Sequence, residues 1–350
     1  MRTGHGRAPG RVNLIGEHTD YNQGLVLPIA MRLSVSVEAR ERTDGHVRVA
    51  TDASVEPREG AYELGHERKD GTWTDRVRAV THALAANGLR IRGFDAQVTS
   101  TLPSGAGLGS SAAFAIALIR ALADLFSLRI SDRAIAGIAH QAETGPLVGA
   151  RAGLLDQLSS VFGREDSALL VDLRDESTES IALLPAFELA VIDSATRHEH
   201  ATGGYNQRRA ECEGAASHLG VSSLRDLEER PLGDVLERLP PPLDRRVRHV
   251  ITENARVRAA VATLRDRDDR RLGELLSASH RSLRDDYEVS TPVLDRLVEI
   301  ACAEGALGAR LVGGGFGGSI IALTRKGEGS DLARRVVRRS EGARLVAVVP

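Results

Sequence analysis

The feature that most constrains the fold is a glycine-rich loop between a strand and a helix. We expect a strand over 93–99, the segment TLPSGAGLGSSAA follows over 101–113, and we expect a helix of small residues over 110–126. Glycines let a backbone approach a phosphate, the freed N–H groups point at it, and a helix N-terminus adds positive potential. The loop matches neither a Walker A motif nor a Rossmann loop. We interpret it as an anion-binding loop of another kind, and a flexible connection is the alternative.

A second segment concentrates hydrogen-bonding groups near the N-terminus. The run GRVNLIGEHTDYNQG, over 10–24, holds the cation Arg11, the carboxylates Glu17 and Asp20, and the imidazole His18. Such a density of donors and acceptors suits a polyhydroxylated ligand such as a sugar. The alternative is a turn between strands with solvated charges.

Composition excludes several classes of function. The chain has 350 residues, 42% of them hydrophobic and 27% charged, which is enough for a substantial core and favours two domains. A net charge of -2 with 3% aromatic residues argues against a nucleic-acid surface. Neither an apolar run long enough for a membrane span nor an apolar signal core is present, so we expect a cytoplasmic protein without a membrane partner. Cys212 and Cys302 lack metal-ligand spacing, so we expect both to be reduced and structural.

The order of the expected elements indicates a mixed α+β chain. We expect two domains, over 1–185 and 186–350, with the boundary near Pro185. The second half is richer in helices up to about Glu304 and closes with strand, glycine loop, strand, helix and strand over 310–349. The expected strands of the earlier part are 12–15, 25–29, 33–39, 47–50, 93–99, 168–172 and 189–193, and the expected helices are 73–86, 110–126, 131–143 and one from about 154.

These segments resemble the GHMP small-molecule kinases, and within them the galactokinase family. The run over 10–24 with the strand Leu27–Ala30 after it resembles the galactokinase signature, and the loop over 103–113 resembles the family's ATP-binding loop. The stretches 279–298 and 308–323 extend the resemblance over nearly the whole chain, and the second contains a glycine motif that in the family packs beside the ATP loop. The resemblance implies a two-domain GHMP-kinase-like fold with the active site in the cleft between the domains.

The resemblance also implies a phosphoryl-transfer site that uses ATP and Mg²⁺. Ser111 and Glu143 match the family's magnesium ligands, although Glu143 could be an ordinary helix carboxylate. The segment GLLDQLSS, over 153–160, resembles the family's catalytic motif, so Asp156 would accept the proton of the sugar 1-hydroxyl and Arg11 would stabilise the charge opposite it. The alternative for Asp156 is a carboxylate near a helix N-cap. The residues implied for ATP binding are Pro103, Ser104, Gly105, Ala106, Gly107, Leu108, Gly109, Ser110 and Ser111.

The sugar would be D-galactose, phosphorylated on its anomeric hydroxyl by a protein that we expect to be a monomer. Arg151-Ala152 replaces the Pro-Cys often found before the catalytic motif, so kinases for galacturonate, arabinose or N-acetylgalactosamine are alternatives. A sugar- and ATP-binding regulator without catalysis is a further one. Tyr205 could instead cap its own helix. The residues that match the family's sugar-binding positions are Glu17, His18, Asp20, Gly153 by its backbone, and Tyr205 by its hydroxyl.

Overall fold

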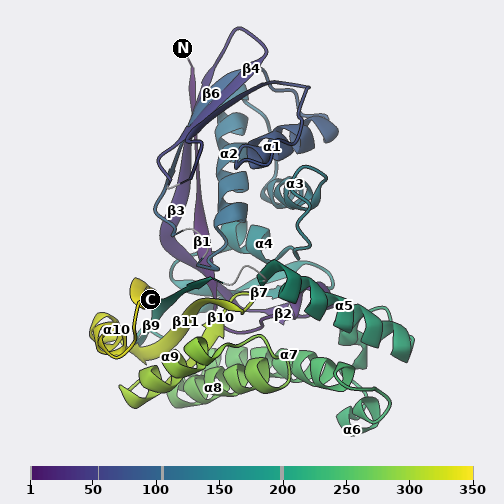
Figure 1. The fold of residues 1–350 in the computed structure, drawn as a ribbon, viewed down its shortest axis with the longest axis vertical. Helices are drawn as coiled ribbons and strands as arrows, with labels where there is room; N and C mark the ends of the chain where they lie inside the picture. The colour runs from purple at the N-terminus through teal and green to yellow at the C-terminus, as the bar shows by residue number, and fades with distance from the viewer. Residues whose placement is uncertain (1, 54, 104–105, 198–200, 350) are drawn as a thin grey trace. The chain divides into compact units, whose positions relative to one another are not determined.

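The chain forms two compact units in a computed structural model that describes residues 2–53, 55–103, 106–197 and 201–349. The first unit is Met1–Arg11, Ala30–Ser104 and Leu108–Gly163; the second is Val12–Ile29, Gly105–Gly107 and Arg164–Pro350. Each unit mixes helices with sheet (Figure 1), so the predicted α+β class is confirmed. None of the helices described is long and apolar enough to cross a membrane.

The first unit is built on a mixed sheet. Strand β3 (Pro28–Glu41) pairs with β6 (Phe94–Ser100), β6 with β4 (His46–Thr51) and β4 with β5 (Glu59–Glu63), and β1 (Thr3–Asn13) pairs with β3 on its other side. The β4–β6 pair is parallel, whereas β3–β6 and β4–β5 are antiparallel. Residues of β1 alternate between buried and more exposed up to Ala8, as expected of a strand with one face against a core.

Among its described residues, the first unit has four helices. They are α1 (Asp75–Ala86), α2 (Ser110–Phe126), α3 (Asp132–Thr144) and α4 (Leu155–Phe162), and α3 packs against the other three. Strand β1 lies directly against α2 (Figure 1), because Gly4 and Gly6 have no side chain to keep the two backbones apart. A Cβ on Gly6 would lie 2.0 Å from the carbonyl oxygen of Ala117. This close packing fixes α2 against the strand that carries Arg11.

The second unit contains an antiparallel sheet covered by helices. Its strand order is β10 (Gly308–Val312), β11 (Gly317–Arg325), β9 (Phe187–Arg197) and β12 (Arg344–Val349). Helices α8 and α9 pack against β10, and α7 runs beside α8 (Figure 1). Strand β7 (Ser167–Asp172) pairs with β2 (Leu25–Val26) and β8 (Ser177–Ala182). The helices of this unit are α5 (Ala201–Leu219), α6 (Leu232–Leu236), α7 (Leu243–Asp266), α8 (Asp269–Asp285), α9 (Pro292–Ala303) and α10 (Gly329–Arg338), with short 3₁₀ helices at Asp20–Asn22 and Leu224–Leu227.

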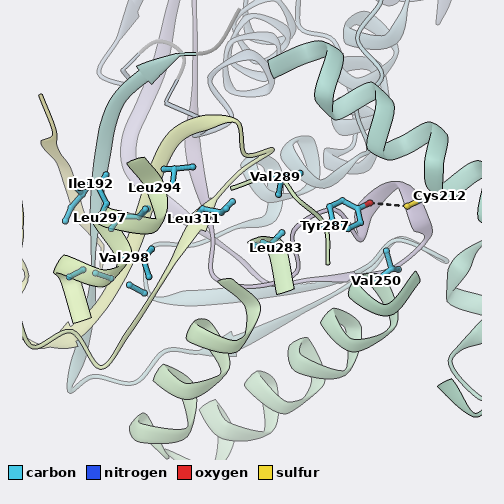
Figure 2. Packing of buried hydrophobic residues seen from close by; sticks show 14 of the residues in the cluster. Ile192, Cys212, Val250, Leu283, Tyr287, Val289, Leu294, Leu297, Val298 and Leu311 are labelled. Atoms are coloured by element: carbon cyan, nitrogen blue, oxygen red, sulfur yellow. Dashed lines mark hydrogen bonds between the residues drawn. The ribbon is translucent and has the colours of Figure 1, made fainter. Parts of the chain in front are cut away.

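A single apolar cluster joins the helices of the second unit to its sheet. Figure 2 shows Ile192 and Leu311 of the sheet facing side chains of α9, and the cluster continues to Tyr287, just beyond α8. The hydroxyl of Tyr287 lies 3.0 Å from the sulfur of Cys212 on α5 (Figure 2). Removing this apolar surface from water stabilises the unit by roughly 25 cal/mol for each Å². The cluster therefore holds α5, α9 and the segment around Tyr287 in fixed positions.

Most expected elements are present, and the exceptions have physical reasons. Strand β1 covers Thr3–Asn13, whereas the sequence predicted a strand over 12–15. Its earlier part pairs with β3 and contacts α2 through glycines, so it has no apolar run that would have indicated a strand. Strands β5 and β8 were not expected, since their polar sequences GAYE and STESIA show little apolar alternation.

The compact units also divide the chain differently from the expected boundary at Pro185. The division falls at Gly163, because β7 and β8 pair with β2 of the second unit. Residues 12–29 also belong to the second unit, although in the sequence they come before most of the first unit. Compactness does not test independent folding, so the domains over 1–185 and 186–350 stay a prediction.

Candidate active site

The glycine-rich loop ends at the N-terminus of α2. Gly109 is the N-cap residue and has φ +71°, and Gly107 has φ +76°, a backbone region that favours glycine. The carbonyl oxygen of Leu108 accepts a hydrogen bond of 3.0 Å from the backbone N–H of Arg11. The loop is thereby tied to the end of β1. Ser104 and Gly105, which were expected to bind ATP, lie outside the described residues.

An ion pair lies against this helix N-terminus. The Nη2 atom of Arg11 is 2.5 Å from Oδ1 of Asp156, which stands in the first turn of α4. A Cβ on Gly109 would lie 3.3 Å from Cγ of Arg11 and 3.5 Å from Oδ2 of Asp156. The Arg11 side chain is 10% exposed and that of Asp156 28%, so the carboxylate keeps access to solvent. A cation, a carboxylate and a helix N-terminus thus meet at one place in the first unit.

A second carboxylate lies beside this pair. Glu143, near the end of α3, accepts a hydrogen bond of 2.5 Å from Nε2 of Gln157. Burial raises its pKa, the negative charge of Asp156 raises it further, and a hydrogen bond from Ser111 opposes the rise. Across the part of the chain that the structure describes, no group of three or more His, Cys, Asp or Glu side chains could hold a metal ion. The donors here are instead a hydroxyl and a carboxylate, which are oxygen ligands of the kind that Mg²⁺ takes.

In the second unit, Glu17 is held from three sides. Its carboxylate accepts hydrogen bonds from the backbone N–H of Gly313, at 3.0 Å, and from Nδ2 of Asn13, at 2.9 Å. It also forms an ion pair with Arg310, whose side chain is fully buried. Arg310 donates a further hydrogen bond of 2.8 Å to the carbonyl oxygen of Leu14. The pair therefore connects the N-terminal motif to the strand that leads into the third glycine motif.

The imidazole of His18 is surrounded by tyrosine rings. The backbone of His18 is in the left-handed conformation, with φ +64°. The centroid of its ring lies 5.4 Å from that of Tyr205 and 4.7 Å from that of Tyr287. Burial lowers its pKa to about 3, so the ring is neutral at physiological pH. The ring of Tyr205, on α5, also lies 5.4 Å from that of Tyr21 and is partly exposed. Asp20, at the start of a 3₁₀ helix, is partly exposed as well.

The third glycine motif packs against the glycine-rich loop, as the resemblance implied. A Cβ on Gly313 would lie 3.4 Å from the carbonyl oxygen of Gly107, which is an ordinary contact distance, so glycine is favoured here by the positive φ angles, +83° at Gly313 and +76° at Gly107, and not by the spacing. The hydroxyl of Ser319 donates a hydrogen bond of 3.1 Å to the carbonyl oxygen of Ala106. The backbone N–H of Phe316 donates to Val289, at 2.7 Å, and thereby anchors the motif within the second unit.

The structure gathers the expected residues into two groups, each described within its own unit. The first unit holds Gly153, partly exposed ahead of α4, and places Arg151 at the surface. The prediction of a cleft between the domains stays a prediction. The first group is Arg11, Leu108, Gly109, Ser110, Ser111, Glu143 and Asp156, and the second is Glu17, His18, Asp20, Ala106, Gly107 and Tyr205.

Sequence reasoning missed several residues of these groups. Arg310 stands in the strand GARLV, whose residues are all buried, and a charge inside an apolar strand is a signal that could have found it. Gln157 stands next to Asp156 within the catalytic motif, but only the structure shows that it bonds to Glu143. Tyr21 and Tyr287 are separated by 266 residues, and their contact has no local signal.

Three family models match parts of this chain. Residues 75–164 match the model of the GHMP kinases N terminal domain, residues 259–342 that of the GHMP kinases C terminal region, and residues 2–41 the galactokinase galactose-binding signature. A galactokinase of Roseiflexus sp. is 42% identical over 91% of this chain and 83% of its own length. One of Thermotoga petrophila is 39% identical over 95% of this chain and 92% of its own length.

Solved structures show the same relationship. The crystal structure of Lactococcus lactis galactokinase complexed with galactose is similar with a TM-score of 0.94 and 30% identity, covering 99% of this chain and 93% of that one. The mevalonate kinase of Methanococcus jannaschii shares the fold, with a TM-score of 0.72 at 18% identity and coverage of 99% and 97%. Fold and site together define a small-molecule kinase of the GHMP class. Within that class, the chain is 39–42% identical to these galactokinases over more than nine tenths of its length. The chain belongs to the galactokinase family.

Proposed function

We propose that this protein transfers the γ-phosphoryl group of ATP to the anomeric hydroxyl of D-galactose and releases α-D-galactose 1-phosphate and ADP. The observation that carries the proposal is the meeting of Arg11, Asp156 and Gly109, with a 2.5 Å ion pair against the N-terminus of α2. The galactose part rests on the family and on the similarity to a galactokinase that was crystallised with galactose.

The chemistry needs positioning and charge stabilisation more than covalent help from the protein. The oxygen of the sugar 1-hydroxyl forms the new bond to the γ-phosphorus, the bond from that phosphorus to the bridging oxygen breaks, and ADP leaves with the electron pair. Asp156 accepts the hydroxyl proton on its carboxylate. Arg11 stabilises the negative charge that builds on the transferred oxygens, since its guanidinium already lies against both the carboxylate and the helix N-terminus.

The loop from Pro103 to Ser111 binds the ATP phosphates in this proposal. Its backbone N–H groups and the N-terminus of α2 favour anions. Ser111 and Glu143 would hold Mg²⁺, which would neutralise negative charge on the ATP phosphates. Gln157 keeps the Glu143 carboxylate in place through its 2.5 Å hydrogen bond.

The sugar hydroxyls are bound by Asp20, by the hydroxyl of Tyr205 and by the backbone at Gly153. Asp20 and Tyr205 are partly exposed, which leaves room for a ligand to reach them. Glu17 and His18 belong to the same site, and their hydrogen bonds to Gly313 and Gly314 fix its shape.

The test is Asp156→Asn, which keeps the size of the side chain and removes the proton acceptor. We expect kcat for ADP release to fall by about 10²- to 10⁴-fold while KM for ATP changes little. Asp132→Asn is the matched control, because Asp132 is a first-turn carboxylate of the neighbouring helix α3 with an exposed side chain. A folded Asp156→Asn enzyme with normal turnover would remove this residue from the mechanism.

A panel of sugars tests the substrate in the same assay. Galactose should give the highest kcat/KM, because a site built to bond one arrangement of hydroxyls leaves polar groups unpaired against another. Faster turnover of galacturonate would make the exposed Arg151 the residue that selects the sugar. Tight binding of galactose without any ADP release would indicate a regulator.

A further inference from the structure

A continuous line of hydrogen bonds runs through the second unit from the third glycine motif to a buried thiol. The Nε2 atom of His18 lies 3.2 Å from the carbonyl oxygen of Gly314, and its Nδ1 lies 2.8 Å from the hydroxyl oxygen of Tyr21. That oxygen lies 2.8 Å from the hydroxyl of Tyr287, which in turn lies 3.0 Å from the sulfur of Cys212. We call these four side chains, from His18 to Cys212, the hydroxyl chain.

The carbonyl group at one end, together with the neutral imidazole of His18, fixes the direction of every bond in the hydroxyl chain. A carbonyl oxygen only accepts, so Nε2 of His18 carries a hydrogen and donates it to Gly314. Burial keeps the imidazole neutral by lowering the pKa of His18 to about 3, so Nδ1 has no hydrogen and accepts from Tyr21. The single hydrogen of Tyr21 is then used, and Tyr287 must donate to Tyr21.

The same reasoning reaches the thiol. Because Tyr287 has given its hydrogen to Tyr21, its oxygen accepts the S–H of Cys212. All three groups keep their hydrogens at neutral pH, since burial raises the pKa of Cys212 to about 11 and raises the pKa of Tyr21 and of Tyr287 well above the ordinary value.

The far part of the hydroxyl chain is held rigidly. The backbone oxygen of Tyr287 accepts a hydrogen bond of 2.6 Å from Nε of Arg208, and Arg246 donates at 2.6 Å to the neighbouring backbone oxygen of Asp286. The ring centroid of Tyr287 lies 4.7 Å from that of His18 and 4.4 Å from that of His249. Figure 2 shows Tyr287 with its hydroxyl directed at Cys212 and with Leu283 and Val289 close by. Tyr287 is therefore held in one position, and through its hydrogen bond to Tyr21 it can orient the His18 ring.

The other end of the hydroxyl chain, at His18, lies beside residues of the proposed sugar site. The His18 ring packs against Tyr205, and a Cβ on Gly314 would lie 3.2 Å from Cδ2 of Tyr205. Tyr205 therefore contacts both the His18 ring and the glycine whose carbonyl oxygen accepts the hydrogen bond of His18.

We propose that Tyr21, Tyr287 and Cys212 are positioning residues for the sugar site, which hold His18 as the Nε2–H tautomer and through it fix Gly314 and Tyr205. The proposal rests on the function proposed above, because it gives the sugar as the ligand that Tyr205 receives. The positioning residues act on sugar binding through His18 and do not touch the reacting atoms. They should therefore affect KM for galactose and leave kcat nearly unchanged.

The tautomer is tested in the wild-type protein by nitrogen NMR of a sample labelled with ¹⁵N-histidine. The signal of His18 is identified by its absence from the spectrum of His18→Gln. We expect a protonated Nε2 and an unprotonated Nδ1 at pH 7.5, and a protonated Nδ1 would overturn the proposal. This measurement needs no substrate, so its result is independent of whether galactose is the sugar.

Kinetics of conservative variants test the effect on the sugar. Tyr21→Phe should raise KM for galactose by about fivefold or more, because Nδ1 of His18 loses its donor inside the protein, and Tyr287→Phe should have a smaller effect in the same direction. Tyr62→Phe is the matched control: Tyr62 is a buried tyrosine of the first unit whose hydroxyl lies 2.9 Å from Thr81, and its loss should leave KM unchanged.

The cysteine supplies a test with little change in volume. Cys212→Ala removes the last donor and should raise KM for galactose, whereas Cys212→Ser retains a donor and should restore the wild-type value. Equal KM values for folded Tyr21→Phe, Tyr287→Phe and wild-type proteins would overturn the proposal. If both tyrosine variants fail to fold, equal KM values for Cys212→Ala and wild type would overturn it. If wild type releases ADP with a different sugar, the galactose assignment fails, and the same comparison is made with that sugar.

Discussion

Replacing Arg310 by Met should be among the most destabilising single changes in the second unit. The guanidinium is fully buried, pairs with a Glu17 residue that is 4% exposed, and donates 2.8 Å to the carbonyl oxygen of Leu14. Methionine fills much of the same space but leaves the carboxylate with only Asn13 and Gly313 as donors. Breaking one partner of a buried ion pair costs about 3–5 kcal/mol, which is a large share of the ~5–15 kcal/mol that stabilises a typical domain.

A double-mutant cycle measured by urea unfolding separates the pair from general packing. The double variant Glu17→Gln with Arg310→Met has neither charge. Its loss in free energy of unfolding should therefore be smaller than the sum of the two single losses, by ~2 kcal/mol or more. Arg40→Met is the control, since the Arg40–Glu38 pair is exposed and should contribute less than ~1 kcal/mol. Additive costs in the cycle, or a loss below ~1 kcal/mol for Arg310→Met, would refute the reasoning.

Three further outcomes follow from the same geometry. Asp20→Ala should raise KM for galactose more than it lowers kcat in steady-state assays, because a partly exposed carboxylate that binds a hydroxyl acts in the ground state as well; a collapse of kcat at unchanged KM would place Asp20 in the catalytic machinery. Ser111→Ala should raise the Mg²⁺ and ATP concentrations needed for half-maximal rate, and unchanged titrations would exclude its hydroxyl as a ligand. The free energy of unfolding should fall from pH 7 to pH 5, because burial lowers the pKa of His18 to about 3 and of His249 to about 4, so the unfolded chain binds protons that the native one does not. Burial raises the pKa of Glu17 to about 7, and the proton that this carboxyl binds in the native state offsets roughly one histidine. Each histidine should cost ~2 kcal/mol at pH 5, and equal urea midpoints at the two pH values would contradict this.

The parts of the site that lie within one short segment could be predicted, because each forms a recognisable sequence motif. The glycines at 107 and 109 take the left-handed conformations that a turn into a helix requires, and the strand before them and the helix after them were expected. The resemblance placed Arg11 opposite Asp156 in the expected reaction, but the ion pair between these residues, which are 145 positions apart, was seen only in the structure.

Contacts between distant buried polar groups could not be predicted in the same way. Arg310 reaches Glu17 across 293 positions, and Tyr287 reaches Tyr21 across 266. Such pairs depend on how helices and strands pack, whereas periodicity reports only which face of one element is buried. For the same reason the edge strands β5 and β8, whose polar residues carry no alternation, were seen only in the structure.

The identity of the reaction product tests the central claim most directly. Incubation of the protein with D-galactose, ATP and Mg²⁺, followed by proton and phosphorus NMR, reports both the phosphorylated oxygen and the anomer. The account predicts α-D-galactose 1-phosphate in equal amount to the ADP formed, and formation of this product about 10²- to 10⁴-fold more slowly by Asp156→Asn. Phosphate on another hydroxyl, or no phosphorylated galactose while another sugar is converted, would contradict it.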